Sequence, residues 1–288
     1  MFPDVLDERS VRMYVDNAAD WMVIHWGASL EAAFQPLLHL LIAIEGFLLW
    51  MPWYVIIFLI AGLAFLATRN WKLPVGVSIL MFMIGAAGYW EESNQTIALM
   101  LASTITALVV GVPVGVAMAL SRPVRSIMRP LLDVMQTLPP FVYLIPGVML
   151  LGPGKVPALL ATVIYAVPPV IRLTDVGIRN VDSDVVEAVS AYGASGWQKL
   201  WHAQLPLALP TIMAGINQTM MMALSMVVIA SMIGAGGLGY QVLQGIGRLE
   251  VSRGLFAGLA IVALAIIFDR IAQSYGRRLQ SQLHMDEG

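Results

Sequence analysis

The segment EAVSAYGASGWQKLWHAQLP, residues 187–206, is polar, yet long apolar segments precede and follow it. It contains two tryptophans, two glycines and the charged residues Glu187 and Lys199. This composition is typical of a folded loop in water. The surroundings of this segment are therefore expected to differ from those of the apolar segments on either side.

The rest of the chain has the composition of a membrane protein. Hydrophobic residues make up 59% of the 288 residues and charged residues 12%, whereas soluble proteins average about 25% charged. The apolar residues form runs long enough to cross the hydrocarbon core, which takes about 20 helical residues. We expect an all-α, polytopic helical membrane protein. Its predicted spans are 30–50, 53–68, 73–90, 95–120, 130–151, 156–174, 207–233 and 254–272.

Several classes of function lack support in the sequence. The net charge of −2 does not favour nucleic acid, and the chain has no cysteine for a disulfide or thiol chemistry. The four histidines share no metal-ligand spacing, and no catalytic triad is present. GPGKV at 152–156 lacks the first glycine and the Ser/Thr of a P-loop, and GAGGLG at 234–239 follows a membrane helix rather than a strand. We therefore expect neither an enzyme nor a chain that binds a metal or cofactor.

The distribution of basic residues predicts the orientation in the membrane, because lysine and arginine favour the cytoplasmic side. With the N-terminus inside, 13 of the 16 basic residues are cytoplasmic; Lys155, Arg248 and Arg253 are outside. Segment 187–206 then faces the cytoplasm, as do both termini.

The N-terminal region 10–26 is amphipathic. Val11, Val15, Ala18, Met22 and Trp26 share one helical face, and Arg12, Asp16 and Asp20 lie on another. This pattern favours a helix in the membrane interface, and the alternative is a surface helix that packs on the protein itself.

Two short helices hinged at a glycine are predicted in the polar segment. Asp184 is the expected N-cap of the first, with Glu187 completing a capping box, and Gly193 ends it. Ser195 and Gln198 repeat the capping pattern for the second helix, which Pro206 helps to end.

Trp197, Leu200 and Trp201 fall at i, i+3 and i+4 and form one apolar face on the second helix. One interpretation is an anchor that docks into a soluble partner, since aromatic residues dominate protein interfaces. The other is that the rings pack on the protein's own spans or lie at headgroup level.

The segment resembles the EAA signature of permease subunits of bacterial ABC importers. Glu187, Ala188, Gly193, Leu205 and Pro206 match its residues and spacing. Two positions depart from it: Val189 stands where alanine is usual, and Ala203 where isoleucine is usual. QTLPPFVYLIP at 136–146, YAVPPVIRLTDVGI at 165–178 and 209–239 resemble the glycine betaine/proline betaine branch. The resemblance covers roughly residues 95–275.

The resemblance implies a type I ABC importer transmembrane domain with extra N-terminal spans. It implies that the segment is a coupling helix in a groove of a separate ATPase subunit, which binds ATP and magnesium. The implied assembly is a homodimer of permeases with two ATPase subunits and an extracytoplasmic solute-binding protein in a bacterial or archaeal inner membrane. The implied cargo is glycine betaine or a related quaternary ammonium osmoprotectant. Choline, carnitine or another solute is the alternative cargo.

The predicted organisation has four parts. They are an N-terminal segment 1–28 with the amphipathic helix, accessory spans 29–92, a permease core 93–275 with the coupling loop 179–206, and a cytoplasmic tail 276–288.

Residues that interrupt the spans, or that place polar groups inside them, are candidates for the translocation pathway. Prolines break membrane helices where neighbours or a wet cavity satisfy the backbone, although a kink can also serve packing alone. Neutral polar residues inside spans line a path or hold helices together. The pathway candidates are Gln136, Pro139, Pro140, Phe141, Tyr143, Tyr165, Asn217, Gln218, Thr219 and Ser225. Gly234, Gly236, Gly237 and Gly239 are expected in a flexible outer loop or gate.

A stand-alone secondary transporter driven by an ion gradient is the rival interpretation. The core spans carry no charged residue deep in the membrane of the kind that proton relays use, and no inverted repeat is visible.

Overall fold

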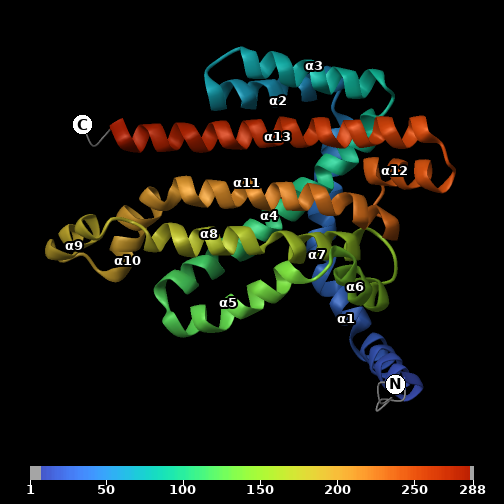
Figure 1. The fold of residues 1–288 in the computed structure, drawn as a ribbon, viewed down its shortest axis with the longest axis horizontal. Coiled ribbons are helices and arrows are strands. Elements are labelled where there is room, and N and C mark those ends of the chain that lie inside the picture. The colour runs from blue at the N-terminus through green and yellow to red at the C-terminus, as the bar shows by residue number, and fades with distance from the viewer. Residues whose placement is uncertain (1–7, 286–288) are drawn as a thin grey trace, which may run out of the picture.

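The computed structural model describes residues 8–285, which form a helical bundle without strands (Figure 1). The N-terminal part comprises α1 (Glu8–Trp50), α2 (Trp53–Thr68) and α3 (Lys72–Ala86). Next come α4 (Trp90–Leu120), α5 (Arg122–Thr137), the 3-10 turn η1 (Pro140–Tyr143), α6 (Leu144–Leu151), α7 (Lys155–Ala166) and α8 (Pro168–Arg179). The C-terminal part comprises α9 (Ser183–Ala191), α10 (Gly196–Lys199), the π-helical turn η2 (Leu200–Gln204), α11 (Leu205–Ala230), the 3-10 turn η3 (Ser231–Ile233), α12 (Gly237–Gly247) and α13 (Val251–Met285).

The described residues contain fewer full-length spans than the eight predicted. Five helices are long and apolar enough to cross a membrane: Ser29–Trp50, Trp90–Leu120, Lys155–Arg179, Gly196–Ile233 and Val251–Arg278. The apolar helices α2 and α3 are shorter, at 16 and 15 residues. The predicted span 130–151 is not straight, because the chain bends by 110° between α5 and the segment Pro140–Leu151. Pro139 and Pro140 lie at the bend and cannot donate the hydrogen bonds that would continue α5.

The N-terminal amphipathic region and the first predicted span form one helix. α1 runs without a break through residues 28 and 29, where the two parts were expected to separate. The side chains described between 13 and 26 are all exposed, so this stretch does not pack on the protein itself. The described part of the chain does not include the side chains of Val11, Arg12 and Val15, nor the tail residues 286–288.

α1 crosses the other long helices at a steep angle near the end of the molecule that carries α12 (Figure 1). It is joined to α7 by an ion pair between buried Glu45 and Lys155, whose Nζ lies 2.6 Å from Glu45 Oε2. The first predicted span therefore contains a buried carboxylate that is neutralised by a partner.

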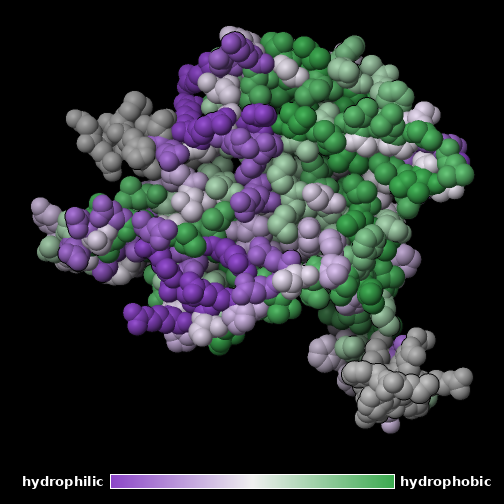
Figure 2. Space-filling view, in the orientation of Figure 1, coloured by the Kyte–Doolittle hydropathy of each residue, from purple (hydrophilic) through white to green (hydrophobic). Residues whose placement is uncertain are grey.

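The bundle has two chemically distinct ends. α8, α11 and α13 run side by side, with α9 and α10 beyond one end and α12 at the other (Figure 1). On the face shown in Figure 2, hydrophilic residues gather at the end with α9 and α10, while hydrophobic residues cover much of the remaining length. This separation is expected of a molecule whose middle lies in lipid and whose loop end lies in water.

Two glycines allow α4 and α8 to approach closely. A Cβ atom at Gly111 would lie 2.5 Å from Val170 Cγ1, and one at Gly115 would lie 2.7 Å from the carbonyl oxygen of Ile171. The GxxxG pattern therefore marks a tight helix crossing, as its use in membrane proteins predicts.

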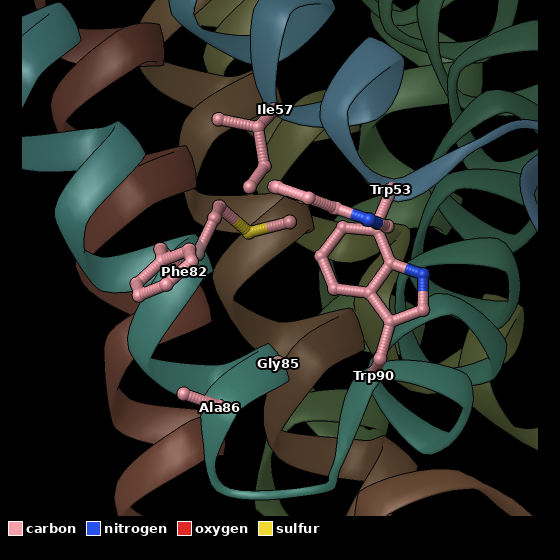
Figure 3. A pocket seen from close by; sticks show the side chains of 7 residues that line it. Trp53, Ile57, Phe82, Gly85, Ala86 and Trp90 are labelled. Carbon is pink, nitrogen blue, oxygen red and sulfur yellow. The ribbon is translucent and has the colours of Figure 1, made fainter.

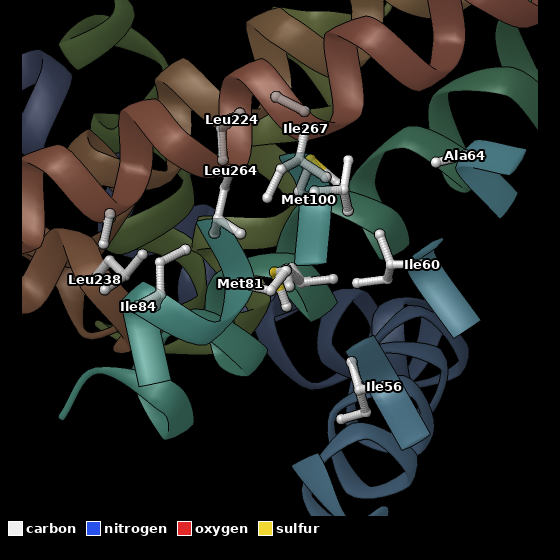
Figure 4. Packing of buried hydrophobic residues seen from close by; sticks show 14 of the residues in the cluster. Ile56, Ile60, Ala64, Met81, Ile84, Met100, Leu224, Leu238, Leu264 and Ile267 are labelled. Atoms are coloured by element: carbon white, nitrogen blue, oxygen red, sulfur yellow. The ribbon is translucent and has the colours of Figure 1, made fainter. Parts of the chain in front are cut away.

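The N-terminal helices α2 and α3 are attached to the rest of the bundle by apolar packing. Ile56 and Ile60 of α2 and Met81 of α3 belong to one buried cluster with Met100 of α4 and Leu264 of α13 (Figure 4). α2 and α3 form a layer over α13 (Figure 1). The N-terminal helices therefore share a core with the rest of the chain.

A cavity of about 380 Å³ lies between α2, α3 and the start of α4. Trp53 and Trp90 lie on one side of it and Phe82 on the other (Figure 3). Its lining side chains carry no ionisable group. Such a lining suits apolar contact with lipid or neighbouring side chains rather than an ionic ligand.

Candidate coupling loop and membrane pathway

The loop 179–206 begins with α9, whose N-cap is Asp182. The carboxylate of Asp182 accepts a hydrogen bond from the backbone N–H of Asp184 at 2.9 Å. The prediction of Asp184 as the cap was therefore wrong by two residues. Asp182 has the non-helical backbone angles of a cap. Asp184 lies in the first helical turn, where its negative charge stabilises the positive end of the helix dipole.

Gly193 breaks the chain after α9 as predicted, and the helix end is a Schellman motif with Tyr192 as the C-cap. The N–H of Gly193 donates to the carbonyl of Ser190 at 2.9 Å, and that of Ala194 donates to the carbonyl of Val189 at 3.3 Å. Gly193 has φ +81°, a left-handed conformation that costs other residues about 1 kcal/mol or more. The hinge between α9 and α10 is therefore fixed rather than loose.

The predicted capping box at the start of α10 is confirmed. Ser195 Oγ accepts from the N–H of Gln198 at 3.3 Å, and Gln198 Oε1 accepts from the N–H of Ser195 at 2.8 Å. These reciprocal bonds satisfy two backbone donors in an exposed loop.

The helix that follows does not end at Pro206. α10 continues through the π-helical turn η2 into α11, and Pro206 lies in the first turn of α11. Proline lacks the N–H that an α-helix would use there, and the π turn, in which the N–H of Leu205 bonds to the carbonyl of Leu200, accommodates it. The loop is consequently joined to α11 by an uninterrupted helical segment.

The predicted apolar face, which spans α10 and η2, is only partly exposed. Trp197 and Trp201 are 66% and 53% exposed, and their rings form an edge-to-face pair with centroids 5.6 Å apart. Leu200 is 1% exposed and packs with Ile178 of α8 and Ile212 of α11. Leu200 therefore packs on the protein itself, as one of the two interpretations expected, because the continuous helix turns this side chain towards the ends of α8 and α11.

The remaining signature residues divide between the tip and the base of the loop. Glu187 and Ala188 are exposed on α9, and Leu205 and Pro206 are half-buried where the loop meets α11. The exposed tryptophan pair, the end of α9 and the fixed hinge form a surface beyond the membrane helices that a partner can contact.

An ion pair that the sequence analysis missed holds the base of this loop. Asp175 of α8 is buried, and its Oδ1 lies 3.1 Å from Nε of Arg125 at the start of α5. Arg125 also donates to the carbonyl of Ala119 at the end of α4. The available signal was that the predicted topology places both residues beyond span ends on the same side.

The proline break in the α5–α6 region brings two predicted pathway residues together. The rings of Tyr143 and Tyr165 form an edge-to-face pair with centroids 6.0 Å apart, and the Tyr143 hydroxyl donates to the carbonyl of Met135. Pro140 is half-buried at the break, while Gln136, Pro139 and Phe141 are exposed.

The polar candidates of α11 lie on different sides of that helix. Asn217 Nδ2 donates to Asp269 Oδ1 of α13 at 2.9 Å, so this side chain joins two helices. Thr219 is buried, whereas Gln218 and Ser225 are exposed. The structure brings Tyr143 and Tyr165 into contact but does not unite the ten candidates in one lining.

The glycines at 234–239 form a packed elbow rather than a flexible loop. Gly234, Gly236 and Gly237 have positive φ angles, and the N–H of Gly237 donates to Gln95 Oε1 at 2.9 Å. A Cβ atom at Gly239 would lie 2.7 Å from Val228 Cα. Glycine is required here for backbone conformation and close approach, which also explains the G-x-G-x-x-G pattern without a nucleotide.

Comparison with known proteins places this architecture in a transport family. Residues 111–281 match the family described as the binding-protein-dependent transport system inner membrane component. The chain is 46% identical, over 93% of its length and 76% of the relative's, to the Escherichia coli K12 glycine betaine/proline betaine transport system permease protein ProW. It is 46% identical, over 80% of its length and 83% of the relative's, to the Listeria monocytogenes glycine betaine/carnitine transport permease protein GbuB.

A solved structure supports the fold at low sequence identity. The chain superposes on an inward-facing MetNI methionine ABC transporter chain with a TM-score of 0.61, covering 69% of this chain and 97% of that one at 20% identity. The common fold is that of a type I ABC importer transmembrane domain, which is a membrane permease and not an enzyme. The chain belongs to the family of binding-protein-dependent transport system inner membrane components.

Proposed function

We propose that this chain is the permease subunit of an ATP-driven importer for glycine betaine or a related quaternary ammonium solute. The exposed pair Trp197 and Trp201, held by the fixed hinge at Gly193, carries the coupling part of the proposal. Rigid aromatic anchors supply large contact area at low entropic cost, which suits a knob seated in a partner's groove.

The proposed partner is a separate ATPase subunit that binds ATP and magnesium. Two such subunits, a second copy of this permease and an extracytoplasmic solute-binding protein complete the assembly. Movement of the ATPase subunits would reach the membrane helices directly, because α10, η2 and α11 are continuous.

In the proposed orientation, the coupling loop and the C-terminal end of α13 are in the cytoplasm of a bacterial or archaeal cell. α1 begins at the opposite end of the molecule, the end that carries α12, so the expected cytoplasmic N-terminus is not part of this proposal (Figure 1). The distribution of basic residues supports this orientation, since 11 of the 16 fall on that side, all except Arg9, Arg12, Lys155, Arg248 and Arg253. α12 and the turn before Lys155 would then face outwards.

The proposed cargo is zwitterionic. The relatives are named for glycine betaine, proline betaine and carnitine, which are neutral overall. Four acidic side chains of the described helices have partners: Glu45 pairs with Lys155, Asp133 with Arg172 and Asp175 with Arg125, and Asp269 accepts from Asn217 and Gln273. Because these four carboxylates are already engaged, they offer no free countercharge to a bare cation such as choline, which favours a zwitterion.

Uptake into reconstituted vesicles tests the cargo. Vesicles that contain the permease, its ATPase and its binding protein should accumulate radiolabelled glycine betaine when ATP is supplied on the ATPase side. Excess unlabelled carnitine should reduce this uptake more than choline does. ATP-driven uptake of choline without uptake of betaine would refute the cargo while leaving the assembly intact.

A further inference from the structure

A cavity of about 580 Å³ lies between the α2–α3 turn and the C-terminal part of α13. Four basic residues line it, and they come from segments about 200 positions apart: Arg69, Lys72, Arg277 and Arg278. None of the described residues that line it is acidic. We call it the basic cavity.

The local structure fixes the basic residues around this cavity. Arg69 has φ +53° and ends α2, with its N–H bonded to the carbonyl of Phe65 at 2.7 Å. Asn70 Oδ1 accepts from the N–H of Lys72 at 3.1 Å. Arg278 reaches across from α13 to donate to the carbonyl of Leu66. A non-glycine residue in the left-handed region costs about 1 kcal/mol or more, so the turn holds its geometry against local strain.

The cavity opens at the boundary between apolar and polar surface. Leu66 and Trp71 beside it are 58% and 69% exposed, and the Trp71 ring lies against Phe65 with centroids 4.7 Å apart. Tryptophan is enriched at the level of lipid headgroups. In Figure 2, hydrophilic residues at this end of the upper layer give way to hydrophobic ones along the helices. A ligand in the cavity would therefore have both polar headgroups and acyl chains as its surroundings.

We propose that the basic cavity binds the headgroup of an anionic phospholipid, such as phosphatidylglycerol. The phosphodiester would lie among Arg69, Lys72 and Arg277, and its acyl chains would lie along the exposed apolar sides of α2 and α13. The bound anion offsets the repulsion among Arg69, Lys72 and Arg277 and links the α2–α3 hairpin to α13. This role is independent of the cargo that the transporter carries.

Native mass spectrometry of the full-length permease, stripped of lipid in detergent, tests the proposal. Phosphatidylglycerol and phosphatidylcholine with the same acyl chains are titrated separately. The wild-type chain should bind phosphatidylglycerol at least about tenfold more tightly. The variant Arg69→Gln/Lys72→Gln should bind it about 30-fold more weakly than wild type, since each basic residue contributes roughly a factor of five.

A matched control separates this site from a general effect of charge. Arg122→Gln/Arg129→Gln removes two exposed arginines of α5 that do not line the cavity, and it should keep the wild-type preference. Equal binding of the two lipids to wild type, or an equal loss in both variants, would overturn the proposal. Displacement of the lipid by millimolar glycerol 3-phosphate would assign the cavity to a soluble anion and refute the lipid.

Discussion

At the residue scale, the coupling loop depends on backbone geometry at Gly193 and on side-chain chemistry at Trp197 and Trp201. The sequence predicted the glycine break and the Ser195–Gln198 capping box because both are local patterns. It could not predict the burial of Leu200, since periodicity defines a face but not what that face meets. The same limit applies to the N-cap of α9, because Asp182 and Asp184 both have a side chain that can cap a helix.

The hinge predicts a specific effect of Gly193→Ala. The left-handed φ of +81° should cost alanine about 1 kcal/mol, which corresponds to roughly fivefold weaker binding of the ATPase subunit if docking requires the native hinge. Titration of the labelled ATPase subunit onto the purified permease measures the affinity. Gly196→Ala is the control, because a Cβ atom there meets nothing within 4 Å and the position has no positive φ. Equal affinities for the two variants would argue against a fixed hinge.

At the element scale, the long apolar helices and the GxxxG crossing were predictable from the sequence. The bend of 110° before α6 was not, because the prolines at 139 and 140 indicate an interruption but give no direction. Nor was the packed elbow at 234–239, whose stability depends on Gln95, more than 100 residues away. The ion pair between Asp175 and Arg125 was missed for the same reason, as it joins helices distant in sequence.

The α4–α8 crossing predicts that Gly115→Val destabilises the permease. The added side chain would meet Ile171 and Thr174, where even a Cβ atom comes within 2.7 Å of backbone, and overpacking typically costs about 1–3 kcal/mol. Thermal unfolding in detergent should show a lower midpoint than for wild type. Gly258→Val of α13, where nothing lies within 4 Å, should unfold near the wild-type temperature; an equal loss in both would contradict the close crossing.

At the scale of the whole molecule, the family and fold were predictable, but the relation of α1 to the bundle was not. The amphipathic pattern at 10–26 and the apolar run at 30–50 looked like two elements, and the structure joins them in one helix. No local signal gives the steep crossing seen in Figure 1, because contacts with α4, α6 and α7 determine it.

The proposed orientation predicts which single cysteines an impermeant thiol reagent can reach from outside intact cells. Val251→Cys, 79% exposed at the start of α13, should be labelled. Tyr192→Cys, 95% exposed on the coupling loop, and Ser126→Cys should react only after the membrane is opened. The native chain has no cysteine to interfere. Labelling of position 192 in intact cells would reverse the orientation.

The central claim is that the coupling loop transmits the work of an ATPase to this permease, and the most direct test removes its tryptophan pair. Trp197→Ala/Trp201→Ala should insert normally but lose the co-purifying ATPase and ATP-driven uptake, because each lost anchor costs about 2 kcal/mol or more. The matched control, Trp50→Ala/Trp53→Ala, removes two tryptophans that are 80% and 52% exposed outside the coupling loop, and it should retain both. Full ATPase recovery and undiminished uptake in the Trp197→Ala/Trp201→Ala variant would contradict the claim.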